Sequence, residues 1–545
     1  MKLDYITLID GHNSTKHDSS VAIWQNGKIY ALAAERVDRI KHSMDAFPAY
    51  QFLIKKRSID LKYKYCFNYF SPEYTPFQEI DHHLAHAASA YYASPYNEAA
   101  ILVVDGMGPY RNNLYASTSL WHGVNHKINL LKIIAEPYPC YRSIGHFYSA
   151  ISWYLGFNFF DSSHTMSIAA YGDPRKFYPK ISSLIWNTDE LFQTDPEFIK
   201  FSLYNKFSNA FTNPPSTEWM QDKQKKYSLV LGPPRSDNEE LKQIHYDIAA
   251  ATQTKTEDIL AKIIRKLYSL TNTDNLCYSG GVALNCVANG RIINNSPFKN
   301  VFIQPASDDT GQALGKVLYR LNNDFRQPEK KIWKMHDAFL GPGYSNKEFN
   351  IAINNSSNHN FEFKSFKSKE IPGIAAELIT KGNVIGWFQG RSEFGPRALG
   401  HRSILADARK LQSVKRIDEC FKRREWYRPF SPSLLRDFAF DYTSKAVVDD
   451  FMLRAVKIDS KFRKLTPAVI HIDGRARVQK VVSINNIYYD LLKEIERRTG
   501  LPVVLNTSLN LPGQPIVETP DDALLSFHNS NLGYLILGNF LIWKK

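Results

Sequence analysis

The first apolar runs of the chain predict a small antiparallel sheet. Strand-like runs occupy residues 5–11, 20–24 and 29–35, and the first of them ends in Asp10-Gly11. Asn26-Gly27 stands between the second and third runs, and Asn-Gly between two apolar runs is a strong signal for a β-hairpin. We therefore expect a strand, an Asp-Gly turn and then a two-stranded hairpin.

A similar group of runs returns further along the chain. Residues 99–108 form an apolar run that ends around Asp105-Gly106, and further runs follow at 114–121 and 128–136, with a turn predicted at His122-Gly123. Both groups have the order strand, Asp-Gly turn, strand, turn, strand. A duplicated unit of this kind is similar to the actin-like ATPase fold, in which two Asp-bearing hairpins face each other across a phosphate cleft.

The remainder of the chain has a mixed α/β pattern. Residues 240–271 carry apolar positions at helical spacing and predict one long amphipathic helix. A strand, a Gly-Gly turn and a helix start are predicted over 275–290. Residues 340–360 are rich in Gly, Pro, Asn and Ser, which is typical of a domain boundary. A helix at 371–382 and a strand at 383–390 then predict an α/β fold for the C-terminal part.

Length and composition fit a soluble protein with more than one domain. The 545 residues are 43% hydrophobic and 22% charged, and a chain of this length exceeds one ordinary core. We place two domains at 1–345 and 360–545. No apolar run of about 18 residues occurs, so no membrane span is expected, and the first residues lack the pattern of a secretion signal. The five cysteines form no CxxC pair, which is typical of the reducing cytoplasm.

The chain is basic, with a formal net charge of +14 from 68 Lys and Arg against 54 Asp and Glu. Nucleic acid, a membrane surface or small anions could be the partners of such a protein. Eleven Lys and Arg, against five Asp and Glu, lie between Arg391 and Arg428 among apolar residues and Gly/Pro turns. Arg397, next to Pro396, is typical of a guanidinium held in place for phosphate oxygens. We therefore prefer a small-anion pocket to a nucleic-acid face.

The segment DHHLAHAASA, residues 81–90, carries two histidines four positions apart. On a helix His82 and His86 lie on one face about one turn apart, which suits two imidazoles on one metal ion. The Glu of the zinc-protease motif HExxH is missing, so that activity is not expected. An isolated pair is more often a packing feature, but Asp105 ends a buried strand and Asp309 precedes a predicted helix. Two imidazoles and two carboxylates suit iron(II), manganese or zinc.

Two further polar segments follow predicted strands. Glycines such as Gly280-Gly281 let backbone N–H groups approach a ligand, and a following helix N-terminus favours anions, although such a pair is usually just a tight turn. The segment LNTSLNLPGQPI, residues 505–516, places hydroxyl and amide groups after an apolar strand. These groups could cap a phosphate or a carbamoyl group, although the segment alone is typical of a loop.

Taken together, the motifs resemble those of the O-carbamoyltransferases, the family of nodulation protein U and of the cephalosporin and aminoglycoside (tobramycin) carbamoyltransferases. The matching segments run nearly from end to end, and their combined order is highly specific. They are HDSSVAIWQNGKI, ERVDRIKH, DHHLAHAASAYYASP, ILVVDGMG, SGGVALN, SDDTG, GRSEFGPRALGHRSIL, KRREWYRPFSPS and LNTSLN.

The resemblance implies an actin-like N-terminal domain, similar to the catalytic subunit of the tRNA threonylcarbamoyl-transfer machinery. It implies a C-terminal α/β domain similar to the threonylcarbamoyl-adenylate synthases. The divalent metal is expected to be iron(II), with manganese or zinc as alternatives. Its implied ligands are His82, His86, Asp105 and Asp309. The residues implied to lie near the nucleotide are Gly280, Gly281 and Asn285.

The resemblance also assigns a C-terminal site for carbamoyl phosphate and the adenylate. Its implied residues are Arg397, Lys422, Arg424, Arg428, Arg477 and Ser508. His17 and Lys41 match positions expected to face the active centre. The family segment Gly-Lys-x-Met-Gly-Leu-Ala is altered here, because His164 takes the place of the Lys. The part that this Lys plays in the family is therefore open for this chain.

The implied activity is ATP-dependent O-carbamoyl transfer. Carbamoyl phosphate and ATP, the latter with magnesium, give a carbamoyladenylate, and the carbamoyl group then passes to a hydroxyl of a small molecule or sugar. Carbamoyl phosphate is anionic and short-lived, so the reaction needs a cationic pocket shielded from water. A general base must take the hydroxyl proton, and we consider His17 for this role.

Two other functions stay open. A tRNA-modifying threonylcarbamoyl-type enzyme would suit the related domains and the charge, but we find no RNA-binding module and expect neither nucleic acid nor membrane as a partner. An actin-like ATP-binding protein without transfer chemistry would leave Arg397, Lys422 and Arg477 unexplained. The expected partner is a hydroxyl acceptor such as a sugar or natural product. A cytoplasmic location is expected, and a homodimer is expected on family grounds alone.

Overall fold

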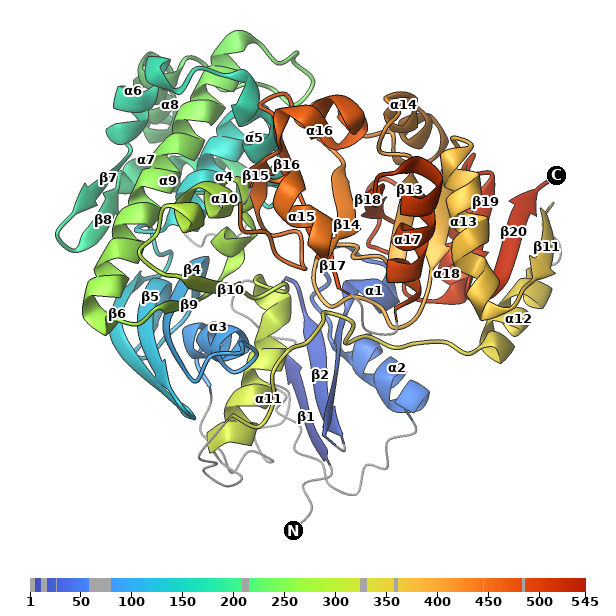
Figure 1. Cartoon of the computed structure of the whole chain (residues 1–545). Helices are drawn as coiled ribbons and strands as arrows, with labels where there is room; N and C mark the ends of the chain where they lie inside the picture. The colour runs from blue at the N-terminus through green and yellow to red at the C-terminus, as the bar shows by residue number, and fades with distance from the viewer. Residues whose placement is uncertain are drawn as a thin grey trace. The chain divides into compact units, whose positions relative to one another are not determined.

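The computed structural model describes residues 5–10, 17–25, 27–57, 80–207, 215–323, 331–356, 361–444, 446–482 and 486–545. Figure 1 traces the chain and labels its elements. The chain divides into two compact units. The first comprises Met1–Gln78, Asp309–Arg320 and Met335–Lys545, and the second comprises Glu79–Asp308 and Leu321–Lys334. Both units mix helices and strands, which confirms the predicted α/β class.

The second unit is built on a five-stranded sheet in the order β10-β9-β4-β5-β6. Its strands are β4 (Glu98–Pro109), β5 (Leu114–Val124), β6 (Lys127–Pro137), β9 (Asn275–Ser279) and β10 (Asn300–Ile303). The three consecutive strands β4, β5 and β6 are antiparallel, as predicted, whereas β9 pairs in parallel with both β4 and β10. Because Val103 of β4 pairs with Ser279 of β9, the Gly-Gly turn after β9 lies beside Asp105-Gly106. The Asp-Gly turn predicted there is wrong: β4 continues to Pro109 with an irregularity in its pairing between Val104 and Gly108, and the chain reverses at Asn112 and Asn113, whose φ angles are 57° and 59°.

The turn predicted at His122-Gly123 is wrong. Strand β5 continues to Val124, and the chain reverses at Asn125, whose φ of 55° lies in the left-handed region. Gly123 serves packing instead, because a Cβ at this position would lie 2.6 Å from ring atoms of Tyr91. A glycine that makes room for an aromatic ring of another element cannot be told from a turn glycine in the sequence alone.

The helices of the second unit surround this sheet. They are α3 (His82–Tyr91), α4 (Ile144–Tyr154), α5 (Ser163–Ile168), α6 (Tyr178–Ser182), α7 (Pro196–Phe207), α8 (Thr217–Leu231), α9 (Gln243–Thr271) and α10 (Cys286–Asn294). The predicted long helix is confirmed as α9. A short antiparallel hairpin pairs β7 (Ile185–Thr188) with β8 (Leu191–Thr194).

The first unit contains the predicted N-terminal sheet. Strands β1 (Tyr5–Asp10), β2 (Ser20–Gln25) and β3 (Lys28–Ala33) are antiparallel neighbours. Gly27, with a φ of 79°, joins β2 to β3, while Asn26 lies outside the described residues. Two helices follow, α1 (Glu35–Asp38) and α2 (Phe47–Arg57).

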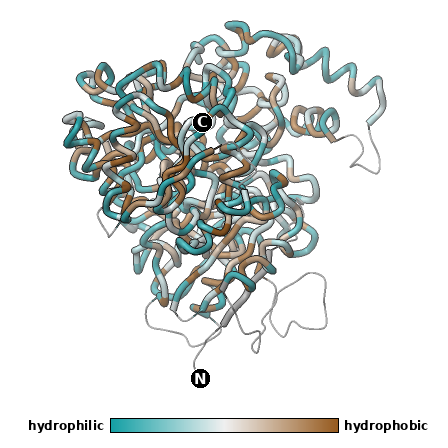
Figure 2. Tube along the Cα trace, turned by 90° about the vertical axis from the view of Figure 1, so that its right-hand side faces the viewer, coloured by the Kyte–Doolittle hydropathy of each residue, from teal (hydrophilic) through white to brown (hydrophobic). Residues whose placement is uncertain are grey.

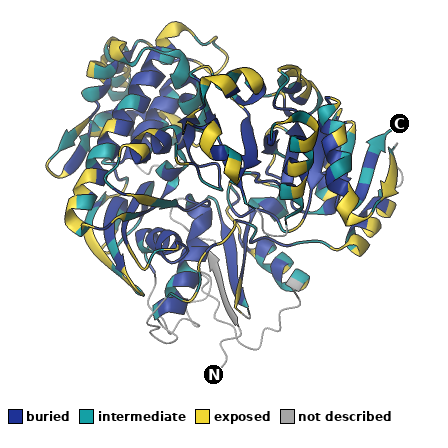
Figure 3. Ribbon diagram, viewed as in Figure 1, coloured by how far each residue is buried: buried dark blue, intermediate teal, exposed yellow. Residues whose placement is uncertain are grey.

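An eight-stranded sheet in the order β11-β20-β19-β12-β13-β18-β14-β17 forms the larger part of the first unit. Its strands are β11 (Phe361–Ser365), β12 (Ile385–Phe388), β13 (Arg402–Ala406), β14 (Ser431–Leu435), β17 (Gln479–Val481), β18 (Val503–Ser508), β19 (Tyr534–Leu537) and β20 (Phe540–Lys544). Ile404 and Leu405 are adjacent in β13 but belong to different apolar clusters. The middle of the sheet is therefore buried on both faces, as its dark blue strands in Figure 3 show.

Helices and a small hairpin complete the first unit. The helices are α12 (Asn346–Asn355), α13 (Ile371–Thr380), α14 (Gln412–Ile417), α15 (Arg436–Tyr442), α16 (Ser460–Leu465), α17 (Ile487–Thr499) and α18 (Pro520–His528), and α11 (Gln312–Asn323) begins here. Strands β15 (Ala455–Lys457) and β16 (Arg475–Arg477) pair antiparallel. The helix predicted at 371–382 and the strand predicted at 383–390 are confirmed as α13 and β12.

Hydrophilic and hydrophobic stretches alternate along the trace in Figure 2. In the described part of the chain, no helix combines the length and the apolar character that a bilayer crossing requires. Four cysteines are free thiols, namely Cys140, Cys277, Cys286 and Cys420, and Cys66 lies outside the described residues.

Candidate functional site

Helix α3 presents its histidines in two different roles. The Asp81 carboxylate accepts the backbone N–H of Leu84 at 2.8 Å and so caps the helix, which begins at His82. The rings of His82 and His86 lie 4.8 Å apart between centroids, as the one-turn spacing predicts. His83 is buried against β5, where it contacts the Ser119 hydroxyl and the Ala116 carbonyl, and burial lowers its pKa to about 3.

Asp105 lies where β4 departs from regular pairing with β5. Its Oδ2 atom is 2.9 Å from Nε2 of His82 and 3.7 Å from Nε2 of His86, and its Oδ1 atom accepts the backbone N–H of Gly281 at 2.9 Å. Burial raises the pKa of Asp105, but the hydrogen bond with His82 and the charges of both histidines lower it more. The net effect holds this pKa well below its usual range, so the group is a carboxylate.

Three glycines make this approach possible. A Cβ on Gly108 would lie 2.1 Å from the His82 ring, and a Cβ on Gly280, which has a φ of 90°, would lie 2.3 Å from the Val104 carbonyl oxygen. A Cβ on Gly281 would come within 3.1 Å of the Asp105 carboxylate. The DGMG and SGG segments therefore bring the two strand ends and the helix together without side chains between them.

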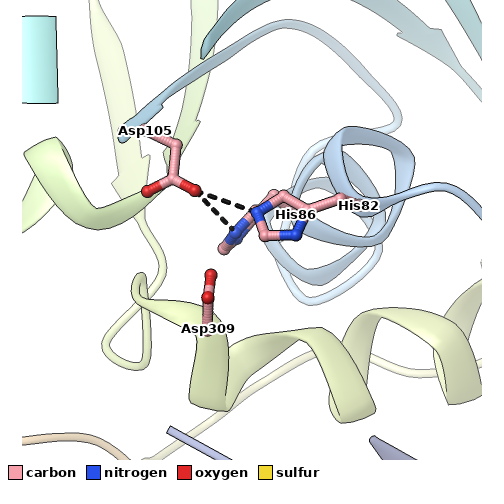
Figure 4. A group of neighbouring side chains, drawn as sticks. All are labelled: His82, His86, Asp105 and Asp309. Carbon is pink, nitrogen blue, oxygen red and sulfur yellow. Dashed lines mark hydrogen bonds and ion pairs between the residues drawn. The ribbon is translucent and has the colours of Figure 1, made fainter. Parts of the chain in front are cut away.

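Asp309 begins the 3₁₀ turn Asp309–Gly311 that leads into α11. Its Oδ1 atom accepts the side-chain amide of Gln312 at 3.0 Å. Ligand atoms of four buried residues lie within 4.8 Å of one another, namely those of His82, His86, Asp105 and Asp309 (Figure 4). Two buried carboxylates in one place are unfavourable without positive charge, and two imidazoles and two carboxylates are a donor set that a divalent cation accepts. The four residues thus fit a metal.

Replacing His86 by alanine should remove bound metal from the purified protein, because the remaining donors would be too few for a stable site. Elemental analysis of wild type and variant checks this. His122→Ala is the matched control, since His122 lies on β5 and pairs with the exposed Glu98. Equal metal content in wild type and His86→Ala would show that the metal is not bound by this group of residues.

Of the other predicted residues of this unit, Gly280 and Gly281 lie next to the segment that carries Asp105. The N–H of Gly281 is directed at Asp105, and Gly280 forms the turn between β9 and the following helix. Asn285 caps α10 by accepting the backbone N–H of Ala288 at 3.0 Å, and its amide pairs with that of Gln253. The role of these residues toward a nucleotide stays a prediction.

A second group of predicted residues gathers in the first unit. Lys422 ends the helical turn 418–422 and is buried, with 6% of its surface exposed. Its ammonium donates to the Ser508 hydroxyl at 3.1 Å and to the backbone and side-chain oxygens of Asn510 at 3.0 and 2.8 Å. The sequence places Ser508 here correctly but gives no reason to single out Asn510 from its loop.

Several cations act on one another around Lys422. Burial holds the pKa of Lys422 well below its usual range, and three positive neighbours lower it further: Arg424, Arg428 and Lys41. Burial, then the charges of Arg428 and Arg477, lowers the pKa of Arg424 to about 9. We call Lys41, Lys422, Arg424, Arg428 and Arg477 the cation cluster. Gathering so much like charge in a buried setting destabilises the free protein, and an anionic ligand would relieve that repulsion.

Two predicted residues remain to be placed. Arg397 is half-buried in the loop between β12 and β13, and its part in anion binding stays a prediction. His17 contacts Asp18, with 2.8 Å between its Nδ1 atom and Oδ2 of the carboxylate, and Oδ1 of Asp18 is 2.8 Å from Nδ1 of His42. The sequence missed Asp18 and His42, although each stands directly beside a residue that it did single out.

His164, which replaces the Lys expected from the family pattern, has a local partner. Its Nε2 atom lies 3.2 Å from the Asp161 carboxylate, and its ring stacks on Phe157 with 4.9 Å between centroids.

Two family models match the chain. The model described as carbamoyltransferase N-terminus matches residues 49–318, and the model described as carbamoyltransferase C-terminus matches residues 376–544. The chain belongs to the carbamoyltransferase family. This carbamoyltransferase is 32% identical to nodulation protein NolO of Bradyrhizobium diazoefficiens over 471 residues, which are 86% of this chain and 79% of the relative.

A named O-carbamoyltransferase is also similar to this enzyme. The 3'-hydroxymethylcephem-O-carbamoyltransferase of Amycolatopsis lactamdurans is 30% identical over 296 residues, which are 54% of this chain and 53% of that protein. Among solved structures, HypF in its phosphate- and nucleotide-bound form matches 59% of this chain and 56% of its own, with 13% identity and a TM-score of 0.32. That likeness is too weak to bear on fold or function.

Proposed function

We propose that this carbamoyltransferase is an ATP-dependent O-carbamoyltransferase with a small-molecule or sugar hydroxyl as acceptor. Carbamoyl phosphate, ATP and water would give carbamoyladenylate, phosphate and pyrophosphate. The acceptor oxygen would then bond to the carbamoyl carbon, the bond from that carbon to the AMP oxygen would break, and AMP would leave. The observation that carries the proposal is the cation cluster around the buried Lys422, because both co-substrates are small polyanions.

The cation cluster supplies what the first step needs. Carbamoyl phosphate and the phosphates of magnesium-bound ATP are negatively charged, and fixed Lys and Arg side chains hold such groups in a water-poor site. The Ser508 hydroxyl and the Asn510 amide, both oriented by Lys422, can contact the neutral carbamoyl end. We assign Arg397, Lys422, Arg424, Arg428, Arg477 and Ser508 to this step.

The histidines and carboxylates of the metal group suit the second step. A divalent cation held by His82, His86, Asp105 and Asp309, iron(II) by preference and manganese or zinc otherwise, would stabilise negative charge on the leaving phosphate. We further propose that Gly280, Gly281 and Asn285 lie near the nucleotide. Gly281 fixes the orientation of Asp105 through its N–H, and this holds one ligand in place before any anion arrives.

The acceptor class rests on the named relative. The Amycolatopsis lactamdurans protein is named for O-carbamoylation of a hydroxymethyl group on a cephem, and we extend to this chain only an acceptor hydroxyl on a small molecule. Actin-like and adenylate-synthase-like domains with bounds 1–345 and 360–545, a cytoplasmic location and a homodimer remain predictions.

Mass spectrometry tests the proposal directly. The purified protein, supplied with carbamoyl phosphate, ATP, magnesium and candidate sugars or natural products, should add one carbamoyl group to one acceptor class. ATP hydrolysis that does not respond to carbamoyl phosphate, without any carbamoylated product, would favour an actin-like ATPase instead. Modification of tRNA with a steep dependence on salt would show that tRNA, and not a small molecule, is the acceptor.

A further inference from the structure

One carboxylate near the N-terminus is shared by two histidines. Asp18 precedes β2, and its two oxygens lie 2.8 Å from Nδ1 of His17 and 2.8 Å from Nδ1 of His42. The Asp18 side chain is 14% exposed, whereas those of His17 and His42 are 22% and 41% exposed. A buried carboxylate thus connects two imidazoles that both reach the surface of this unit.

The backbone holds this arrangement in an unusual conformation. Asp18 and His42 have φ angles of 58° and 57°, in the left-handed region that non-glycine residues rarely adopt. Ser19, next to Asp18, donates its backbone N–H to the carbonyl of Ser43, next to His42, at 2.9 Å. The N–H of His42 itself donates to the Glu35 carboxylate at 3.1 Å. Strain of this kind persists where surrounding contacts fix it, and such places are often functional.

The hydrogen bonds also determine which ring nitrogens carry protons. Burial raises the pKa of Asp18, but its hydrogen bonds with His17 and His42 lower it more, so the net shift is downward and the group is a carboxylate. A carboxylate only accepts hydrogen bonds. Each histidine therefore donates through Nδ1–H, and proton exchange takes place at Nε2.

The surroundings of His42 favour its protonated form. The hydrogen bond with Asp18 raises its pKa, burial opposes this, and the charges of Asp18 and Glu35 raise it further. Lys41 is the neighbouring cation that acts in the opposite direction. A positive charge on His42 partly neutralises the negative charge of Asp18. The carboxylate then favours protonation of His17 less strongly.

The same loop reaches the cation cluster. Lys41 immediately precedes His42, and its charge acts on Lys422. His42, which contacts the Asp18 carboxylate, therefore lies on the loop that brings Lys41 to the cation cluster. Ser20, two residues after Asp18, donates its hydroxyl to the carbonyl of Thr310 at 2.7 Å, so the segment that carries Asp18 lies beside the segment that carries the proposed metal ligand Asp309.

We propose that His42 is a positioning residue that acts through Asp18 to set the orientation and basicity of His17, the base for the acceptor hydroxyl. This inference rests on the proposed function. In the step concerned, the hydroxyl O–H bond breaks and its proton goes to Nε2 of His17. The oxygen bonds to the carbamoyl carbon, and the bond from that carbon to the AMP oxygen breaks. His42 holds Asp18 from the side opposite His17 and keeps His17 neutral enough to accept the proton.

The test is the pH dependence of kcat/KM for carbamoyl transfer in His42→Ala and His42→Asn. In His42→Ala, Asp18 acts on His17 alone, so the acid limb should move upward by about one pH unit, which is about tenfold in rate at a fixed pH on that limb. The plateau should fall as well, because Asp18 is no longer held on both sides. Asn presents an amide N–H near the position of Nδ1, so His42→Asn should restore most of the plateau. His17→Ala should lose transfer altogether.

Exchange of pyrophosphate into ATP separates this inference from the proposed function. Wild type and both His42 variants should show the same carbamoyl phosphate-dependent exchange, because no hydroxyl is deprotonated in that half-reaction. Exchange that is absent from wild type would overturn the proposed function. Normal exchange with an unmoved acid limb in both variants, or a uniform loss at every pH, would overturn the role of His42 alone.

A spectroscopic measurement covers the case in which His42→Ala does not fold. Histidine ¹⁵N NMR of the full wild-type chain should show Nδ1 protonated in both His17 and His42 throughout, with titration at Nε2. An Nε2–H tautomer for neutral His42 would contradict the shared carboxylate.

Discussion

Replacing Lys422 by methionine should abolish the carbamoyl phosphate-dependent exchange of pyrophosphate into ATP. Methionine keeps most of the side-chain volume but removes the ammonium that orients Ser508 and Asn510. A charge-assisted hydrogen bond to a ligand contributes about 1.5–3 kcal/mol, which corresponds to roughly ten- to a hundredfold or more in the rate of exchange. The orientation of Ser508 and Asn510 is lost as well. Arg477→Leu should have the same effect, because Arg477 belongs to the cation cluster and its charge acts on Arg424.

Two comparisons make this result specific. Lys381→Met is the matched control, because Lys381 is exposed on α13 and pairs with Glu377, and its exchange should equal that of wild type. His82→Ala should retain exchange and lose carbamoyl transfer, since the metal group is assigned to the second step. A near-wild-type Lys422→Met or Arg477→Leu enzyme would contradict the assignment, and a His82→Ala enzyme inactive in both steps would mean that the two steps share one site.

The same substitution has an expected consequence for stability. Because burial and like charges lower the pKa of Lys422, keeping its ammonium charged in the folded protein opposes folding. Lys422→Met should therefore unfold at the same or a higher temperature than wild type while being inactive. A large drop in unfolding temperature would point to a structural role for Lys422.

Replacing Arg402 by methionine should lower the free energy of unfolding by about 3–5 kcal/mol. Arg402 is fully buried in β13, where its guanidinium donates to the Gln389 carbonyl at 2.6 Å and lies 3.6 Å from the centre of the Phe388 ring. Its Nη2 atom is 3.8 Å from the Glu518 carboxylate, which is also fully buried. Without Arg402, that carboxylate would lie in the core without the cation that acts on it most strongly, and Arg36 and Arg39 would remain as weaker cationic neighbours.

Urea unfolding of three variants tests this prediction. Burial raises the pKa of Glu518, so the deficit of Arg402→Met should shrink as pH falls and the carboxyl group takes up a proton. Arg402→Met combined with Glu518→Leu should regain much of the loss, because no buried charge is left alone. Arg436→Met is the control, since Arg436 pairs with Asp437 and both side chains are exposed. A double variant no more stable than Arg402→Met would show that the charge pair is not the cause.

Local sequence patterns predict the elements of this protein better than its contacts. The hairpin β2–β3 follows from Asn-Gly, and α9 from regular apolar spacing, because both signals lie within one element. The metal histidines were found for the same reason, since four positions make one helical turn. Asp309, in contrast, can be a ligand only together with residues far away in the sequence. Its place before a predicted helix made it a candidate, and the family resemblance assigned it to one site with His82 and His86.

The basic stretch between Arg391 and Arg428 shows the limit most clearly. Its composition predicts an anion site, and Lys422, Arg424 and Arg428 do belong to the cation cluster. Arg391 serves the fold instead, donating to backbone carbonyls of Leu340 and Gly341, and Arg402 does likewise within the core. A buried arginine that satisfies carbonyl groups and one that awaits a phosphate look alike in a sequence.

The first unit is assembled from segments that leave the ribosome at very different times. Arg36 donates to the Gly395 carbonyl at 3.0 Å, and Arg39 donates to the carbonyls of Pro515 and Ile516 at 2.7 Å each. The second unit is nearly continuous in sequence and can fold during synthesis. Residues 17–57 can make these contacts only after the segments with Gly395, Pro515 and Ile516 have been synthesised. Until then their apolar side chains are exposed to chaperones. A recombinant fragment starting at residue 360 would lack these segments, so fragment complementation with the N-terminal piece is the sounder expression strategy.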